Sequence, residues 1–465
     1  MSKSNKLHQR ALATAMAVAL TAGFAGSAAA AGRVDTAGLH SPDQTSFDRF
    51  IVKYRNGTSV TAQQGSLTKA TKASAQALSA SRVRSLAVGG EVVQASRALD
   101  RVEAEGFMRQ IAADPNVEYV EADLIMKPLM TPNDPHYGTY LWGMQSGTPG
   151  IRADQAWNTT SGAGVVVAVL DTGYTDHSDL VGNILPGYDF ISQSRTAGDG
   201  NGRDSDAHDN GDYYRNEDSS WHGTHTAGTV AAVGNNNKGV IGVAYGAKVV
   251  PVRVLGRGGG YTSDIADGII WASGGSVAGV PANANPAEVI NMSLGGASTC
   301  SSTYQAAIDG AVSRGTTVVV AAGNSNADVS GFTPASCNNV IAVAATNNSG
   351  TRASYSNYGS KIDVAAPGGD SPDCTTLIVS TGNDGLSAPG AENYLCMAGT
   401  SMAAPHVAGT VALMQAARGT KAPLTPAQVE SILKSSLRAF PGSNDKPIGN
   451  GIIDANAAVA AAAAF

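Results

Sequence analysis

Short apolar runs rich in β-branched residues recur through the chain from about residue 131 onward. Runs of this kind are typical of strands that are covered on both faces of a parallel sheet. Helical patterns separate them, and this alternation predicts an α/β fold with a mostly parallel central sheet and helices on both faces. Sites in such folds lie at the carboxyl ends of the strands. The predicted strands are 165–170, 249–254, 289–292, 317–321 and 340–344, and the predicted helices are 222–233, 263–273, 302–314 and 401–418.

The segment from residue 32 to about 129 has a different pattern, which indicates a small, separate β-α-β region. Residues 64–80, rich in Ala, Ser and Lys, predict little regular structure. Prolines and an Asn-Asp pair in 128–135 are typical of a linker to the α/β region. The predicted strands are 50–54, 117–120 and 125–126, and the predicted amphipathic helix is 101–113, with Val102, Phe107, Met108 and Ile111 on one side.

The N-terminus has the pattern of an export signal. Lys3, Lys6 and Arg10 precede an apolar stretch at 11–24, and small residues follow at 27–31. The apolar stretch is short for a membrane span, so a retained anchor helix is the alternative rather than the preferred interpretation. We therefore expect a signal peptide at 1–31, a secreted, extracellular protein, and no stable membrane association.

Composition and charge narrow the class of protein further. The 465 residues are 43% hydrophobic and only 15% charged, which is enough apolar material for a large core and too little charge for a disordered chain. The net charge of -6 gives no reason to expect a nucleic-acid partner. We expect a folded protein that works as a monomer.

The four cysteines, Cys300, Cys337, Cys374 and Cys396, fit an exported protein. An even number in such a chain predicts two disulfides, for which three pairings exist. Cys300–Cys337 and Cys374–Cys396 are favoured because they close local loops, and free core thiols are the alternative. Zinc is not expected, because no CxxC spacing occurs.

Three separated motifs supply an acid, an imidazole and a hydroxyl. Asp171 follows the strand 165–170, while His222 and Ser401 each open a predicted helix beside a glycine. Taken singly, they could be a turn aspartate, a helix-capping histidine and an N-cap serine. Together they match the arrangement in which a carboxylate orients a histidine that takes the proton of a nucleophilic serine.

A stabilised oxyanion completes this chemistry. Backbone N–H groups beside Ser401, at a helix N-terminus, can bind a developing negative charge. Asn324, in the Ala-Ala-Gly-Asn run after the strand 317–321, can supply a second donor through its side-chain amide. The alternative for Asn324 is an ordinary turn residue.

These motifs resemble those of secreted subtilisin-type serine proteases (subtilases, peptidase S8). The matching segments are 169–173, 222–228, 289–296, 321–324 and the Gly-Thr-Ser-Met-Ala-Ala-Pro-His run that opens 399–409. The resemblance implies a subtilisin-like three-layer fold and a serine endopeptidase that works through an acyl-enzyme and needs no cofactor for its chemistry. It implies that Asp171 orients His222, that His222 is the general base and acid, that Ser401 is the nucleophile, and that Asn324 and the Ser401 N–H bind the oxyanion. His225 and His406 are expected to be structural.

The resemblance also places the substrate and a propeptide. A peptide or protein substrate would pair with Ser293, Leu294 and Gly295 on one side and with Gly258, Gly259 and Gly260 on the other. Ala321, Ala322 and Gly323 would line the pocket for the residue before the cut, with Phe332 and Thr333 near its floor, and broad specificity is expected. Residues 32–130, with a core at 46–127 like the family's I9-type inhibitor, would be a self-cleaved propeptide of a zymogen, and 131–465 would be the catalytic domain.

Structural calcium is the cofactor that this resemblance implies. Asp134, Asp179 and Asn236 match one calcium site of the family. The alternative interpretation of the segment around Asn236 is a surface Asn/Gly turn. A second candidate is an acidic run, for which the alternative is a solvated loop. It contains Asp199, Asp204, Asp206, Asp209, Asn210 and Asp212.

Two other functions share part of this pattern. A catalytically inactive homologue acting as a binding protein would lack part of the triad, but the triad is intact. An esterase or lipase would carry Gly-x-Ser-x-Gly, but the local sequence is Gly-Thr-Ser-Met-Ala.

Overall fold

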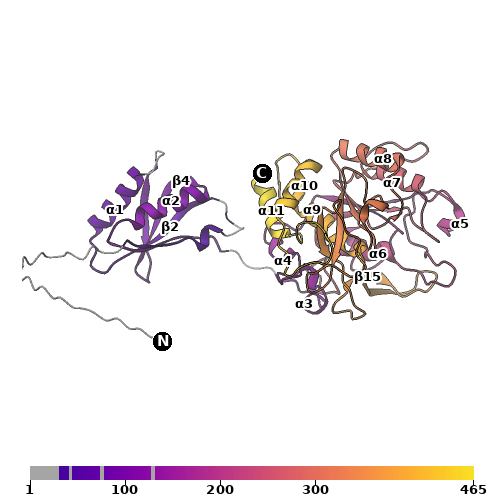
Figure 1. Ribbon diagram of the computed structural model, residues 1–465, viewed down its shortest axis with the longest axis horizontal. Helices are drawn as coiled ribbons and strands as arrows, with labels where there is room; N and C mark the ends of the chain where they lie inside the picture. The colour runs from indigo at the N-terminus through magenta and orange to yellow at the C-terminus, as the bar shows by residue number, and fades with distance from the viewer. Residues whose placement is uncertain (1–30, 41–43, 45, 74–77, 127–130) are drawn as a thin grey trace, which may run out of the picture. The chain divides into compact units, whose positions relative to one another are not determined.

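The structure, a computed structural model, describes residues 31–40, 44, 46–73, 78–126 and 131–465. The chain divides into two units, Met1–Ile125 and Met126–Phe465 (Figure 1). The predicted signal peptide lies almost wholly outside the described residues. Each unit is therefore taken by itself.

The first unit contains a five-stranded sheet in the order β1-β5-β2-β4-β3, covered by two helices. Phe50 and Phe107 meet edge to face at 5.1 Å in its core, where Met108 and Ile111 are also buried. Asp100 and Glu103 form a reciprocal capping box at the start of α2. The elements are β1 (Arg33–Asp35), η1 (Ala37–His40), β2 (Phe47–Tyr54), α1 (Val60–Ala73), β3 (Ala80–Ser85), β4 (Gly90–Leu99), α2 (Arg101–Ala112) and β5 (Val117–Ala122).

Three details of the first unit differ from the prediction. Residues 64–80, expected to be weakly structured, include most of α1 and the start of β3. Val102 is 75% exposed, because five residues of helix turn it well away from Phe107. Ile125 and Met126 are exposed and form no strand, since β5 ends at Ala122.

The second unit contains a seven-stranded sheet in the order β14-β13-β11-β9-β6-β8-β7, in which every pair of adjacent strands is parallel. Side chains alternate between its two faces. Val167 and Val169 of β6 pack in one hydrophobic cluster with α6 and α9, whereas Ala168 and Leu170 pack in another with α7 and α8. The α/β class predicted from the sequence, a mostly parallel sheet between two layers of helices, is confirmed.

For the strands of the sheet and the helices that cover it, the predicted bounds agree closely with those of the structure. The strands are β6 (Val166–Asp171), β7 (Tyr188–Asp189), β8 (Lys248–Arg253), β9 (Val289–Met292), β10 (Gly296–Ala297), β11 (Thr317–Ala321), β12 (Phe332–Thr333), β13 (Ile341–Thr346), β14 (Val364–Pro367), β15 (Ile378–Asn383) and β16 (Glu392–Met397). The helices are α3 (Tyr137–Tyr140), η2 (Trp142–Met144), α4 (Ala153–Ala156), η3 (Val181–Asn183), α5 (Ser194–Ala197), α6 (His222–Ala231), α7 (Thr262–Ala272), α8 (Ser302–Ser313), η4 (Val329–Gly331), α9 (Thr400–Ala416), α10 (Pro426–Ser435) and α11 (Ala455–Ala464).

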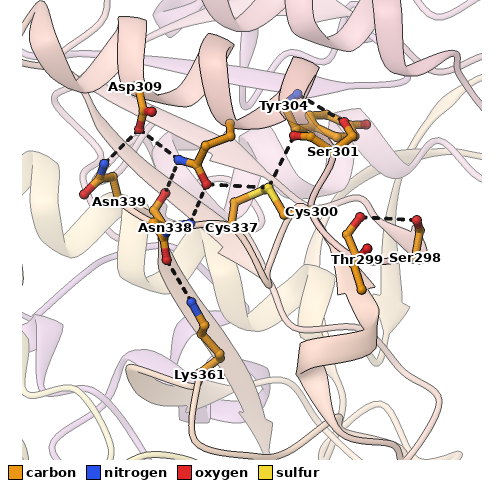
Figure 2. The surroundings of a disulfide bond; sticks show 11 residues. Ser298, Thr299, Cys300, Ser301, Tyr304, Asp309, Cys337, Asn338, Asn339 and Lys361 are labelled. Atoms are coloured by element: carbon orange, nitrogen blue, oxygen red, sulfur yellow. Dashed lines mark hydrogen bonds between the residues drawn. A yellow bond between two sulfur atoms is a disulfide. The ribbon is translucent and has the colours of Figure 1, made fainter.

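Two disulfides join segments outside the sheet, in the pairing that the sequence favoured. Cys300–Cys337 links the chain before α8 to the chain before β13, with the two Cα atoms 5.0 Å apart. Figure 2 shows this bond beside α8, where a network of hydrogen bonds joins Asp309 and Asn338. Cys374–Cys396 ties the antiparallel hairpin of β15 and β16 to the segment before it.

Candidate active site

The three candidate catalytic residues occupy defined ends of their elements. Asp171 is the last residue of β6, His222 is the first of α6, and Ser401 is the second of α9. The sheet order places β9 between β6 and β11, which leads to Asn324. Because parallel strands end at one edge, Asp171, the Ser293 segment and Asn324 lie at the ends of three neighbouring strands or just beyond them.

Asp171 and His222 form a close hydrogen-bonded pair. His222 Nδ1 lies 2.7 Å from Asp171 Oδ1, and the carboxylate is fully buried. Asp171 also accepts the Thr172 N–H at 2.8 Å and the Thr226 hydroxyl at 3.2 Å. With Nδ1 donating its proton to the carboxylate, Nε2 of the neutral ring is left as the acceptor, which is the tautomer a general base needs.

The electrostatic surroundings of His222 favour its protonated form. Burial lowers the pKa of the imidazole, but the charge of Asp171 and the hydrogen bond to it raise the pKa by more. Asp212 and Asp209 add to the same effect. The net pKa is therefore above the ordinary histidine value. An imidazolium that forms during a reaction would be stabilised here.

The residue before His222 is held by a hairpin that is distant in the sequence, a contact that no sequence pattern predicts. Trp221 has a left-handed backbone, with φ of 52°, and its indole N–H donates to the Gly385 carbonyl at 2.7 Å. The Ser219 N–H donates to Leu386 O, also at 2.7 Å. Gly385 and Leu386 lie in the turn between β15 and β16, the hairpin tied by Cys374–Cys396. This hairpin therefore fixes where α6 begins.

Ser401 lies against the end of β9. Its hydroxyl donates to the Ser293 carbonyl at 3.2 Å, and the Ser293 hydroxyl donates to the Ser401 carbonyl at 2.7 Å. Among the hydrogen bonds of the described residues, none joins Ser401 to His222. Bonds of this kind are often long in free enzymes and shorten when substrate binds.

Asn324 is oriented by the first residue of α9. Its Oδ1 accepts both the backbone N–H and the hydroxyl of Thr400, at 2.9 and 2.8 Å. Two donors identify this atom as the oxygen, so the amide nitrogen is the other end of the group. No acceptor among the described residues engages that nitrogen, and Asn324 lines the same cavity as Ser401. The amide can therefore donate to an atom bound in the cavity.

The cavity beside Ser401 has a volume of about 350 Å³. Gly323 has φ of 99°, which favours glycine, and a β-carbon there would lie 3.4 Å from the Phe332 ring. Phe332 and Thr333, in β12, pair with β10 and form part of the wall. Of the residues expected to contact substrate, Ser293, Leu294, Gly295, Ala321, Ala322 and Gly323 line this cavity.

The second predicted substrate segment belongs to another cavity. Gly258, Gly259 and Gly260 line a hollow of about 930 Å³ that contains none of the residues around Ser401. Gly258 and Gly259 have φ of 81° and 113°, which L side chains rarely adopt.

His225 and His406 are buried within the helices that carry the site. His225 Nε2 lies 3.0 Å from Ile378 O and 3.1 Å from Leu395 O, and His406 Nδ1 lies 2.8 Å from Met402 O. Burial lowers the pKa of His225 to about 3 and that of His406 to about 4. Both rings are thus neutral: His225 joins α6 to β15 and β16, whereas His406 bonds within α9.

Asp134, Asp179 and Asn236 come together as one group. Asp134 accepts the Asn235 and Asn236 N–H groups at 2.9 and 3.4 Å, and the Asn236 amide donates to Asp179 at 2.6 Å. Both carboxylates are buried, and neither pairs with a Lys or Arg among the described residues. Their oxygens are the kind of ligand that a hard cation takes.

The acidic run from Asp199 to Asp212 does not form a comparable group. Within the described residues, no cluster of three or more His, Cys, Asp or Glu side chains suits a metal ion. Each carboxylate has a partner of its own, although Asp204, Asp209 and Asp212 accept only from neutral groups and Asp212 still raises the pKa of Asp209. Asp199 pairs with Arg253, Asp204 accepts from Asn201, Asp206 pairs with His208, Asp209 accepts the Thr172 hydroxyl, and Asp212 accepts from Ser220.

Comparisons with known proteins agree with this arrangement. A family model described as "Subtilase family" matches residues 162–451. An "Extracellular protease" of Xanthomonas campestris pv. campestris is 54% identical over 463 residues, 96% of this chain and 78% of the relative. An "Extracellular basic protease" of Dichelobacter nodosus is 46% identical over 432 residues, 88% of this chain and 70% of the relative. A solved protease structure from Pseudoalteromonas arctica has a TM-score of 0.69 and 57% identity, covering 72% of this chain and all of that chain.

Proposed function

The chain belongs to the subtilase family and is a serine-type endopeptidase, and we propose that Asp171, His222 and Ser401 carry out its reaction. The observation that supports this assignment best is the 2.7 Å bond from His222 Nδ1 to the buried Asp171 carboxylate. It leaves Nε2 free to accept a proton at the sheet edge where α9 presents Ser401.

The proposed reaction uses these residues in the following steps. The hydroxyl oxygen of Ser401 attacks the carbonyl carbon of a bound peptide while His222 Nε2 takes the hydroxyl proton. The Asn324 amide and the Ser401 N–H donate to the oxyanion, and His222 then passes its proton to the departing amine. Water, activated by the same imidazole, hydrolyses the acyl-enzyme and restores the serine.

A protease assay with matched inhibitors tests this function. Clearing of casein should disappear with a serine-directed phosphonyl fluoride and in Ser401→Ala, while that variant, as an uncleaved precursor, still unfolds in a cooperative transition. Binding of casein without cleavage would favour the binding-protein alternative. Turnover of acyl esters with no cleavage of casein or peptides would favour the esterase alternative.

We propose broad specificity with a preference for large apolar residues before the cut. The support is a cavity of about 350 Å³ whose walls include Ala321, Ala322 and Gly323, which are too small to fill it. Profiling of cleavage sites in a mixture of denatured proteins tests this, and a strict requirement for one residue type would contradict it.

We propose that residues 32–130 are an I9-type propeptide that the enzyme removes from itself. In support, this segment forms a compact unit with its own core, and the Xanthomonas relative aligns over 96% of this chain, which includes the segment. The Ser401→Ala precursor should accumulate uncleaved, and cleavage in the wild type should occur near 129–131. Normal processing of the variant in a pure preparation would contradict self-cleavage.

We propose one structural calcium site at Asp134, Asp179 and Asn236. A bound calcium ion would neutralise the two buried carboxylates and stabilise the fold, but it would take no part in bond cleavage. A chelator should lower the melting temperature of the wild type, and Asp179→Asn should reduce the difference between calcium-loaded and chelated protein. A melting temperature insensitive to both chelator and added calcium would contradict the site.

We propose that the protein is secreted and works outside the cell as a monomer. Two relatives are named extracellular proteases, and the first 31 residues have the pattern of a signal peptide. Among the described residues, no helix has the length and apolar character needed to cross a membrane. N-terminal sequencing and intact mass of protein from the culture medium, with its size by light scattering, test these points.

A further inference from the structure

A cavity of about 930 Å³ next to Gly258–Gly260 is lined by three arginines and three tyrosines. We call it the arginine cavity. Apart from Gly258–Gly260, no motif found in the sequence indicates it, because its walls come from three separate segments. Its arginines are Arg195, Arg215 and Arg257, and its tyrosines are Tyr213, Tyr214 and Tyr261.

The arginines of this cavity have no acidic partner. No Asp or Glu lines the cavity, and none of the three arginines forms an ion pair with a described residue. Other arginines of the same unit do so. Arg203 pairs with Asp264 at 2.7 Å, and Arg352 with Asp445 at 2.7 Å. The three exposed guanidinium groups therefore form a local positive site on a chain with a net charge of -6.

Two of the guanidinium groups are positioned by their surroundings. Arg215 lies over the Tyr214 ring, 5.1 Å from its centre. Arg257 lies against Gly198, where an added β-carbon would come within 2.6 Å of Nε, and its backbone N–H donates to Thr196 O at 2.8 Å. Guanidinium groups that are held in this way lose less side-chain entropy when they bind a carboxylate.

The glycine edge of the cavity would connect it to a bound substrate. Gly258–Gly260 is the segment that we expect to pair with the backbone of a bound peptide, and the same residues form one wall of the arginine cavity. Side chains of a peptide bound along that edge would alternate in direction, and some would point toward the arginines.

We propose that the arginine cavity is a substrate subsite that binds acidic side chains a few residues before the cut. This inference rests on the proposed function, since it concerns the same peptide. A carboxylate can accept two parallel N–H bonds from one guanidinium group, and the tyrosine hydroxyls can donate further bonds. The cavity would thus add selectivity that the pocket beside Ser401 cannot supply.

Matched fluorogenic peptides test the proposal. Each pair has one cleavable sequence and differs only by Glu or Gln at a single position, two to six residues before the cut. At low salt, we expect Glu to raise kcat/KM about tenfold at one or more positions, the order expected for charge-assisted bonds. This preference should shrink at high salt, because exposed charges are screened.

Variants of the exposed arginines assign the effect to the cavity. The triple variant Arg195→Gln, Arg215→Gln, Arg257→Gln should lose the preference for Glu and cleave the Gln peptides at the wild-type rate. Lys446→Gln removes one positive charge elsewhere on the same unit and should keep the preference. The rate on Gln peptides also reports whether the triple variant is folded.

The outcomes separate this inference from the proposed function. Equal cleavage of Glu and Gln peptides by the wild type, or an unchanged preference in the triple variant, would overturn the subsite alone. Absence of cleavage of every peptide by the wild type would overturn the proposed function, and the subsite with it.

Discussion

Replacing Thr400 by Val should impair catalysis more than folding, because Thr400 fixes the amide of Asn324. The Thr400 hydroxyl donates to Asn324 Oδ1 at 2.8 Å and accepts the Gly323 N–H at 3.0 Å. Valine has nearly the same shape but can form neither bond. The Thr400 N–H still reaches Asn324 at 2.9 Å, so the amide is loosened rather than released.

The magnitude follows from the bonds that are lost. Each neutral hydrogen bond contributes about 0.5–1.5 kcal/mol, so the free energy of unfolding should fall by about 1–3 kcal/mol. Removing an oxyanion donor altogether costs roughly 10²–10³ in kcat, which is the expectation for Asn324→Ala. A loosened donor should cost less, and we expect kcat to fall about tenfold in Thr400→Val, which corresponds to about 1.4 kcal/mol.

The assay compares two Thr→Val changes in one helix. Thr410 is also buried in α9, and its hydroxyl donates to His406 O at 2.8 Å. Thr410→Val loses one bond and should lower the free energy of unfolding by about 0.5–1.5 kcal/mol. It should keep the wild-type kcat on a fluorogenic peptide, and KM should change little in either variant. The reasoning is refuted if Thr400→Val keeps the wild-type kcat, or if Thr410→Val loses as much.

Three further changes test the surroundings of the site. Because the pKa of His222 is raised, kcat/KM should rise with pH through a midpoint above about 6.5. Asp171→Asn should move that midpoint to lower pH and lower the rate, and an unmoved midpoint would contradict the pairing of Asp171 with His222. Arg253→Met leaves the carboxylates of Asp189 and Asp199 without their cation and should lower the free energy of unfolding in urea near pH 8 by about 3–5 kcal/mol. A loss below about 1 kcal/mol would show that these ion pairs are not needed for stability. Trp221→Phe removes the bond to the β15–β16 turn and should lower kcat several-fold with little change in KM; wild-type kinetics would rule out positioning by the hairpin.

Much of the fold could be predicted because its signals are local. A buried parallel strand is a continuous apolar run, and each run predicted after residue 131 matches a strand to within a few residues. The ends of these runs also located Asp171 and Asn324, since a polar residue after a buried strand lies at the carboxyl edge. The error at Val102 has a local cause too, because it is one apolar residue on the polar side of α2.

The parts of the site that could not be predicted depend on distant partners. Trp221 binds a carbonyl 164 residues away, and Thr400 binds a side chain 76 residues away. No periodicity or spacing in the sequence records such contacts. The charges of the acidic run were visible, but their partners, such as Arg253, become apparent only when the loops are folded together. The arginine cavity was missed for the same reason.

The most direct test of the catalytic assignment is to locate the covalent bond that a phosphonyl fluoride forms with the protein. We predict that the intact mass increases by one adduct, that peptide mapping places the adduct on Ser401, and that His222→Ala greatly slows its formation. Ser401→Ala should form no adduct and should cleave no peptide. An adduct on another residue in the active wild-type enzyme, or peptide cleavage by pure Ser401→Ala, would contradict the account.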